Sequence, residues 1–502
     1  MLRLAAWSAC LLLTGFQPAL TSQPASVPPQ PSASEPATPI SMAGARSLFA
    51  AKRYAEADAV MRAVLDGADF KQDPASAQRE AVRLAVSIAR ELKQYDRAAV
   101  LAARATAFKD QEAGDWLSRA RAALQNNDPQ DAATSLAVVA RRWPYALNGN
   151  DGIVNETARA VRDQRHADAH RELLEALLDM RWLHGDGTEP SGLWRDLSLE
   201  LLDKNLTDRA IDAATHVADP YVLIEMRADR RLAKVMQSRI VHTNVKNAAI
   251  DAVATARQGM HEHPGSLARV TALTSALMTM QQYQEILDTT APIVERVRTA
   301  APGLKPYEDV ERQYEWVLHA RARALLEMGR HDDALAEQRA ALAANARAPS
   351  VSQAINLAGM LNDMGHPSEA LAVLPVDADL TPYGFMELQS VRFESALLMH
   401  DDAAAAAALK YLRDHEADSP VTLQHMLAIS GAANDAARIW IARLADPWLR
   451  TDALVEAQQY APRHGPPQAL AWQASWLALT NRPDVRAAIN AVGSVDRYPM
   501  IR

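Results

Sequence analysis

The chain has 502 residues, more than one hydrophobic core normally supports, so several domains or a linear array of repeats is expected. Its net charge of −8 at neutral pH shows no basic excess, which excludes an ordinary nucleic-acid-binding protein. Hydrophobic residues make up 49% of the chain but aromatic residues only 5%, and alanine tracts such as residues 403–408 favour helices over strands. The composition therefore predicts an all-helical protein whose helices pack closely on small side chains.

The N-terminal segment has the pattern of a secretory signal. Arg3 precedes an apolar stretch over residues 4–16 that is too short to cross a bilayer, so we expect a signal peptide over residues 1–22 and export to the periplasm. The only cysteine, Cys10, lies inside this leader, and the small residues before it leave lipid anchoring open as a less favoured alternative. Residues 23–40, which are rich in proline, are predicted to form a disordered tether.

From residue 41 onward a helix–turn–helix pattern recurs. The first copy has small residues at Ala45 and Ala57 on either side of a break that ends at Tyr54. The second copy repeats this pattern with Tyr95 and Ala98. The third copy is the clearest, because it combines Trp116, Ala120, Ala132 and Pro144, and Ala132 lies 34 residues after Ala98.

This third copy resembles the tetratricopeptide repeat (TPR). That family places an aromatic residue early in its first helix, small residues where the two helices come closest, and a proline where the second helix ends. The resemblance implies an all-α, right-handed solenoid of TPR-like helical hairpins. It also implies structural roles in the repeats for a set of residues: Ala45, Tyr54, Ala57, Tyr95, Ala98, Trp116, Ala120, Ala132, Pro144, Trp194, Ala322, Gly329, Ala334, Ala358, Gly365 and Ala370.

Later copies define the predicted domains. Gly329 and Gly365 occupy equivalent places 36 residues apart, where a left-handed residue would end the first helix of a hairpin. Residues 220–265 show no clear hairpin break and are predicted to form an irregular helical connector. The connector separates an N-terminal solenoid over residues 41–219 from a C-terminal one over residues 266–502.

Few residues suggest chemistry. The chain contains none of the common nucleophile, phosphate-loop or zinc-protease motifs. His166 and His170 share a helix face and could bind a metal, with Glu172 or His184 as further ligands, but two surface histidines at the start of a second helix are the favoured interpretation. No cofactor, metal or catalytic residue is therefore assigned.

Two other groups of residues have structural and functional interpretations. The acidic doublets Asp332-Asp333 and Asp401-Asp402 are expected to cap the second helices of their hairpins. The C-terminal tryptophans, among them Trp448, Trp472 and Trp476, form either the apolar end of the array or a platform that stacks on a sugar.

The sequence thus favours a non-catalytic scaffold of the cell envelope that binds a protein or peptide in the concave groove of a TPR-like array. A polysaccharide-binding component of an export system is the alternative, and a metal-dependent enzyme is less favoured. Nucleic acid is not an expected partner, and no membrane span is predicted.

Overall fold

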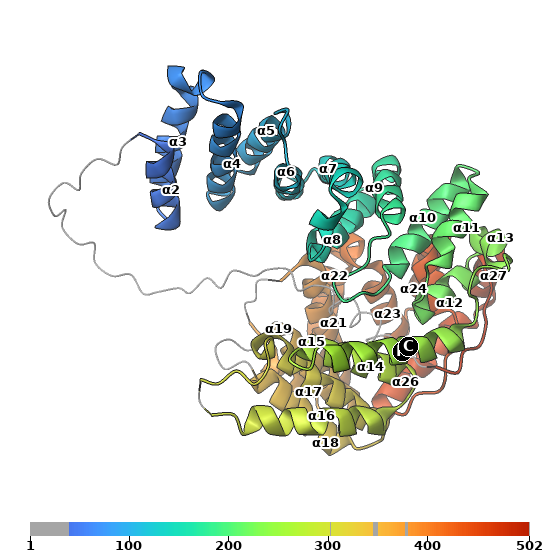
Figure 1. Ribbon diagram of the computed structural model, residues 1–502. Coiled ribbons are helices and arrows are strands. Elements are labelled where there is room, and N and C mark those ends of the chain that lie inside the picture. Colours follow the sequence, from blue (N-terminus) through green and yellow to red (C-terminus); the bar gives the residue numbers. More distant parts are fainter. Residues whose placement is uncertain (1–39, 302, 345–349, 377–379, 501–502) are drawn as a thin grey trace. The chain divides into compact units, whose positions relative to one another are not determined.

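The computed structural model describes residues 40–301, 303–344, 350–376 and 380–500 (Figure 1). The described residues form helices and no strand, with two isolated bridges, between Asp229 and Gly493 and between Gln459 and Arg497. The chain divides into two compact units, a smaller one that ends at Val217 and a larger one that contains Ala218 and the residues after it. The predicted signal peptide over residues 1–22 and nearly all of the tether lie outside the described residues.

The smaller unit is a row of helical hairpins in which a first helix packs against a second helix. Its first helices are α2 (Met42–Ala50), α4 (Ala75–Glu91), α6 (Ala113–Gln125), α8 (Asp151–Asp163) and α10 (Ser191–Asp203). Its second helices are α3 (Tyr54–Asp66), α5 (Tyr95–Thr106), α7 (Pro129–Arg142), α9 (Ala167–Asp179) and α11 (Thr207–Thr215), and two short 3-10 helices follow α3 and α7, η1 (Ala68–Lys71) and η2 (Pro144–Leu147).

The larger unit continues the same pattern. Its first helices are α15 (Leu267–Thr279), α17 (Val310–Glu327), α19 (Val351–Asp363), α21 (Pro382–Met399) and α23 (Pro420–Ile429). Their second helices are α16 (Tyr283–Arg298), α18 (His331–Ala343), α20 (Pro367–Val373), α22 (Asp402–Asp414) and α24 (Ala433–Ala445), and η4 (Glu416–Asp418) precedes α23. The unit ends with α25 (Arg450–Glu456), α26 (Pro467–Thr480) and α27 (Pro483–Val492).

The segment predicted as an irregular connector begins the larger unit. It forms α12 (Pro220–Ala228), η3 (Arg230–Leu232), α13 (Ala233–Met236) and α14 (Val245–Glu262). Helix α12 packs against α14 and also against α25, near the other end of the unit. Among the described residues, no helix combines the length and the apolar composition that a bilayer crossing requires.

A left-handed residue ends the first helix of almost every hairpin, which gives the turns one common geometry. At Gly329 and Gly365 the φ angles are 75° and 80°, the conformation expected at these two positions. The amide of the next residue then donates to a carbonyl five residues earlier, as Arg330 does to Leu325 over 2.9 Å, and this satisfies a helix-end acceptor. The equivalent residues in the other hairpins are Lys52, Lys93, Asn127, Arg165, Asn205, Gln281, His400 and Gly431.

The acidic residues at the starts of two second helices differ in their roles. Asp401 is the N-cap of α22, and its carboxylate accepts a hydrogen bond from the amide of Ala404 at 3.0 Å. The expectation that Asp332 or Asp333 caps α18 is wrong, because the N-cap residue is Arg330 and no side chain caps this helix. Both carboxylates lie in the first turn instead, where they still interact favourably with the helix dipole.

The first and last elements of the larger unit are joined through a close backbone approach. The amide of Ser494 donates to the carbonyl of Ala228 at 3.0 Å, next to the bridge between Asp229 and Gly493. A Cβ atom on Gly493 would lie 2.3 Å from the Ala228 carbonyl oxygen and 2.6 Å from Leu454. Only glycine fits at this position, because a real Cβ cannot come so near to backbone.

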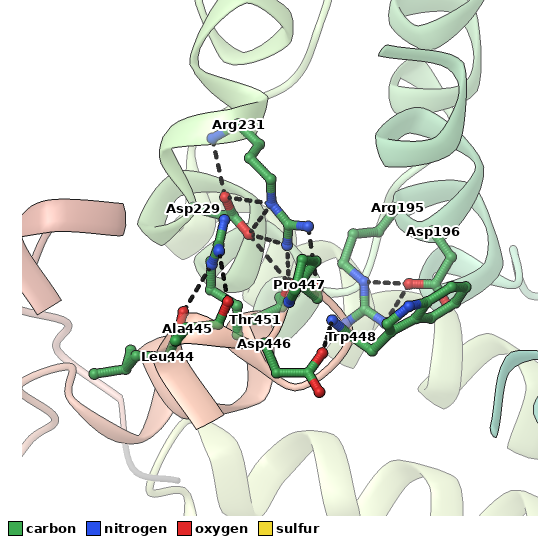
Figure 2. A network of polar contacts seen from close by, with 11 residues as sticks. Arg195, Asp196, Asp229, Arg231, Leu444, Ala445, Asp446, Pro447, Trp448 and Thr451 are labelled. Carbon is green, nitrogen blue, oxygen red and sulfur yellow. Dashed lines mark hydrogen bonds and ion pairs between the residues drawn. The ribbon is translucent and has the colours of Figure 1, made fainter. Parts of the chain in front are cut away.

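Two adjacent arginines that follow α12 strengthen this junction. Arg230 donates to the carbonyls of Asn490 and Ala491 at 2.6 and 3.1 Å, which caps the C-terminal end of α27. Arg231 contacts the Asp229 carboxylate and donates to the carbonyl of Pro447 at 3.1 Å (Figure 2). The start of the unit is therefore held to helices more than 200 positions further along the chain.

We expect Gly329→Ala to destabilise the larger unit by about 1 kcal/mol, because alanine pays a steric cost in the left-handed region that glycine does not. Lys93→Gly should have the opposite sign and stabilise the smaller unit by about 0.5 kcal/mol, since Lys93 already adopts this conformation. Urea unfolding followed by circular dichroism measures both. Equal effects of the same sign would contradict this account of the turns.

Gly493→Ala should destabilise the larger unit by about 3 kcal/mol, because neither the Ala228 carbonyl nor the segment around residue 493 can move without breaking the junction. Gly465→Ala is the matched control, since a Cβ there meets only the Ala469 side chain at an ordinary 3.7 Å. Thermal unfolding of the two variants compares them directly. If Gly493→Ala melts together with Gly465→Ala, the close approach does not constrain the fold.

Candidate binding surfaces

The residues assigned to the repeats lie mainly in the cores of the two units. Trp194 is 1% exposed, while Tyr54, Tyr95 and Trp116 are partly buried at or near the starts of their helices. Pro144 begins η2, directly after the end of α7. The alanines are fully buried where helices pack against each other: Ala45, Ala57, Ala98, Ala120, Ala132, Ala322, Ala334, Ala358 and Ala370.

The residues considered for a metal site do not come together as a set of ligands in the described structure. The Nδ1 atom of buried His170 lies 2.6 Å from the Glu200 carboxylate on α10, whereas His166 is the N-cap residue of α9. Glu172 pairs with Arg141 at 2.7 Å. Over the described ranges of the chain, no group of three or more histidine, cysteine, aspartate or glutamate side chains is placed to hold a metal ion.

The C-terminal tryptophans separate into core and partly exposed residues. Trp476 stacks on Trp440 with ring centroids 4.4 Å apart, and both side chains are buried. The indole N–H of Trp440 donates to the carbonyl of Ala453 at 3.1 Å. Trp472 is partly buried on α26, and Trp448 lies in the turn before α25. Trp476 therefore packs inside the protein and presents no ring face to a sugar.

Two first helices of the larger unit, α19 and α23, are covered on every side over most of their length. On α19 each residue from 356 to 362 is buried, and on α23 each residue from 422 to 428 is buried. A helix that packs on one side only would bury about three or four residues in every seven. Continuous burial shows that other parts of the chain also cover the face of these helices that an open TPR-like array would expose.

The chain's own C-terminal segment provides this cover. Helix α26 packs against α19, α23 and α24, and Trp476 meets the ring of His425 on α23 edge-on at 4.6 Å. The segment before α26 extends the contact, because Arg463 donates to the buried Glu327 carboxylate on α17 at 2.7 Å. The faces of α19 and α23 that would line a groove in an open array are therefore part of the core of this unit.

A buried ion pair anchors the cover to α23 and α24. Arg443 donates to both carboxylate oxygens of Glu456 at 2.9 and 2.7 Å and to the Gln424 side chain at 2.7 Å. Burial lowers the pKa of Arg443, but the Glu456 carboxylate outweighs it, so the pKa lies above its usual value. Removing one partner of such a pair costs about 3–5 kcal/mol, because the other charge stays buried without a partner.

A second group of buried polar side chains in the larger unit surrounds His319 on α17. The Nδ1 atom of His319 lies 2.9 Å from the Gln338 side-chain oxygen, and the Gln338 amide donates to Gln353 at 2.9 Å. All three side chains are buried. Burial, together with the positive charge of Arg323, lowers the pKa of His319 to about 3. The imidazole is therefore neutral in the folded protein at physiological pH.

In the smaller unit the first helices bury a single stripe instead. Helix α8 buries Ile153, Val154, Thr157, Ala158 and Val161, a helical repeat on one face. On α6, Gly114 is exposed, and a Cβ added there would meet nothing within 4 Å. The opposite face of these helices is therefore available to a partner.

Charged side chains link one first helix to the next across the smaller unit. Arg46 on α2 pairs with Glu80 on α4 at 2.6 Å. Arg83 on α4 donates to the fully buried Asp115 carboxylate on α6 at 2.9 Å, and this hydrogen bond raises the pKa of Arg83. Asp115 also accepts from the amide of Glu112 at 2.8 Å, which completes a capping box at the start of α6.

Comparison with known proteins finds distant likenesses to solved structures, two of which follow. No family model and no curated protein sequence matches the chain. The hetero-tetramer of Cut9 and Hcn1 from the APC/C matches with 13% identity over 89% of this chain and 94% of that chain, at a TM-score of 0.22. A monomeric IFIT1 mutant with Gppp-AAAA matches with 11% identity over 89% of both chains, at a TM-score of 0.29.

These TM-scores are too low to carry an argument, so the class of the protein rests on its own helices. Successive hairpins share one turn geometry, bury alanines between their helices and stack in chain order. The described chain is an all-α array of TPR-like helical hairpins, arranged in two units.

The His319 environment predicts acid sensitivity. Its folded pKa of about 3 lies below the ordinary value, so from pH 6.5 down to about 3 the unfolded chain binds a proton that the folded protein does not. Stability should fall by about 1.4 kcal/mol per pH unit in this window from this residue alone. The urea-unfolding free energies of wild type and His319→Gln at pH 7 and pH 5 should diverge accordingly. Parallel pH dependences would contradict the prediction.

Proposed function

We propose that this chain is a non-catalytic interaction scaffold of the cell envelope. In this proposal it binds a protein or peptide on the first helices of its smaller unit. One observation carries the choice of surface: residues 356–362 and 422–428 of the larger unit are buried on all sides, while α6 and α8 of the smaller unit are buried on one side. A long face made of successive helices suits an extended or helical segment of a partner.

A binding role is favoured over catalysis because the buried polar side chains described above bond to other parts of the fold. Buried charges such as Arg443 and Glu456 are paired with each other within the fold. Catalysis requires polar groups that converge in a pocket open to a substrate. The metal-dependent alternative gains no support, because Glu172 bonds to Arg141 and the described residues contain no group of three or more histidine, cysteine, aspartate or glutamate side chains placed to hold a metal ion.

The polysaccharide alternative gains no specific support. Its candidate platform included Trp476, which is 1% exposed and stacks on Trp440 in the core. Placement in the envelope rests on the apolar leader and the proline-rich tether of the sequence. Expression of the full chain followed by fractionation tests this part of the proposal, and recovery of an unprocessed chain in the cytoplasm would overturn it.

The surface is tested by a photo-reactive amino acid placed at Gly114, where the structure has open space on the first-helix face. The control carries the same amino acid at Val100 on the second helix α5, which is 71% exposed. We expect irradiation of cells to give a discrete cross-linked protein from position 114 and none from position 100. The same cross-links from both positions, or none from position 114, would contradict a partner on this face.

A further inference from the structure

Arginines recur along the first helices of the smaller unit, and two of them have unusual partners. Arg46 and Arg83 pair with carboxylates on the next first helix. Arg90 on α4 instead donates from Nε to the side-chain oxygen of Gln125 on α6 at 2.7 Å. Arg121 on α6 donates to the side-chain oxygen of Asn150, just before α8, at 2.8 Å. Both guanidinium groups are thus held by neutral amides.

The two guanidinium groups lie close to one another. Gln125, which holds Arg90, is one helical turn after Arg121 on α6, so the two side chains share a face of that helix. Burial lowers the pKa of Arg121, and the positive charge of Arg90 lowers it further. Within the described part of the chain, neither arginine forms an ion pair. The fold therefore keeps two like charges together without an internal counter-ion.

This arrangement lies on the face that the proposed function assigns to a partner. Gly114, Arg121 and Gln125 repeat on α6 at the spacing of one helix face. The amide oxygens of Gln125 and Asn150 fix the position of the guanidinium groups, and each guanidinium keeps further N–H donors. Planar guanidinium groups fixed in this way match carboxylates, which accept two parallel hydrogen bonds.

We propose that Arg90 and Arg121 form a binding site for the carboxylate side chains of an acidic peptide segment of the partner. This inference rests on the proposed function and adds the charge of the ligand to it. The whole chain has a net charge of −8, so long-range electrostatics repel an acidic peptide. Attraction must then arise locally, from arginines whose charges the fold leaves uncompensated.

The test uses fluorescence anisotropy of the full chain with a labelled peptide that alternates glutamate and serine. The same peptide with glutamine in place of glutamate is the reference. We expect the glutamate peptide to bind more tightly, and the double variant Arg90→Gln, Arg121→Gln to weaken it by about tenfold or more. Circular dichroism shows whether the double variant remains folded.

The matched control is Arg141→Gln with Arg209→Gln, which removes the same charge from the second helices α7 and α11. It should leave binding of the glutamate peptide within about twofold of wild type, since these residues do not lie on the first helices. The inference is overturned if both double variants lose affinity equally or if the glutamine peptide binds as tightly. Tighter binding of a poly-dT oligonucleotide than of the glutamate peptide would also overturn it.

Failure of this inference and failure of the proposed function give different results. The photo-reactive group at Gly114 captures a partner on the first-helix face whatever its charge. A cross-linked partner without preference for the glutamate peptide overturns the acidic ligand alone. Absence of a cross-linked partner overturns the surface itself.

Discussion

The backbone at Gly493 passes so close to the carbonyl oxygen of Ala228 that no side chain fits between them. The Ser494 amide bonds to this carbonyl, while Arg230 and Arg231 bond to carbonyls near the C-terminal end. These contacts connect α12 to the last helices of the larger unit. The segment between residues 457 and 480 belongs to the same C-terminal region, and it covers the first helices α19 and α23. The continuous burial of residues 356–362 and 422–428 follows from that cover.

The contacts between the two ends of the larger unit change how its stability is distributed. In a simple repeat array each hairpin contacts only its neighbours, so stability is close to a sum of local terms. Contacts between positions more than 200 residues apart, such as Arg231 with Pro447, couple the two ends of this unit. The smaller unit keeps the simpler arrangement, with ion pairs that join residues about one repeat apart. Its first helices retain an exposed face, and this difference is the reason to locate binding there.

Much of the repeat architecture can be predicted from short-range patterns in the sequence. Alanines such as Ala120 and Ala132 and the glycines at 329 and 365 report local requirements, close helix packing and a left-handed turn. Lysine and arginine in the same left-handed turns, as at Lys93, give no such signal, because their conformation is imposed by the hairpin. The role of Asp332 and Asp333 could not be resolved either, since a shift of only two or three residues separates the N-cap position from theirs in the first turn.

The candidate surface was harder to predict for a different reason. The cover of α19 and α23 depends on contacts between segments distant in sequence, for which a single chain offers no pattern. The pairing of arginines with residues of the next repeat does leave a trace, because Arg83 and Asp115 are 32 positions apart and Arg162 and Asp196 are 34 apart. Searching for opposite charges at the repeat spacing would have identified these pairs.

A cysteine scan tests the central claim most directly, that α19 and α23 of the larger unit are covered while the first helices of the smaller unit keep an open face. In a background without Cys10, single cysteines would be introduced along residues 422–428 of α23 and along residues 117–124 of α6, and their thiol-labelling rates measured under native conditions. The account predicts slow labelling at every position of α23 and a helical alternation of fast and slow positions on α6. A fast position recurring with helical period on α23 would contradict it.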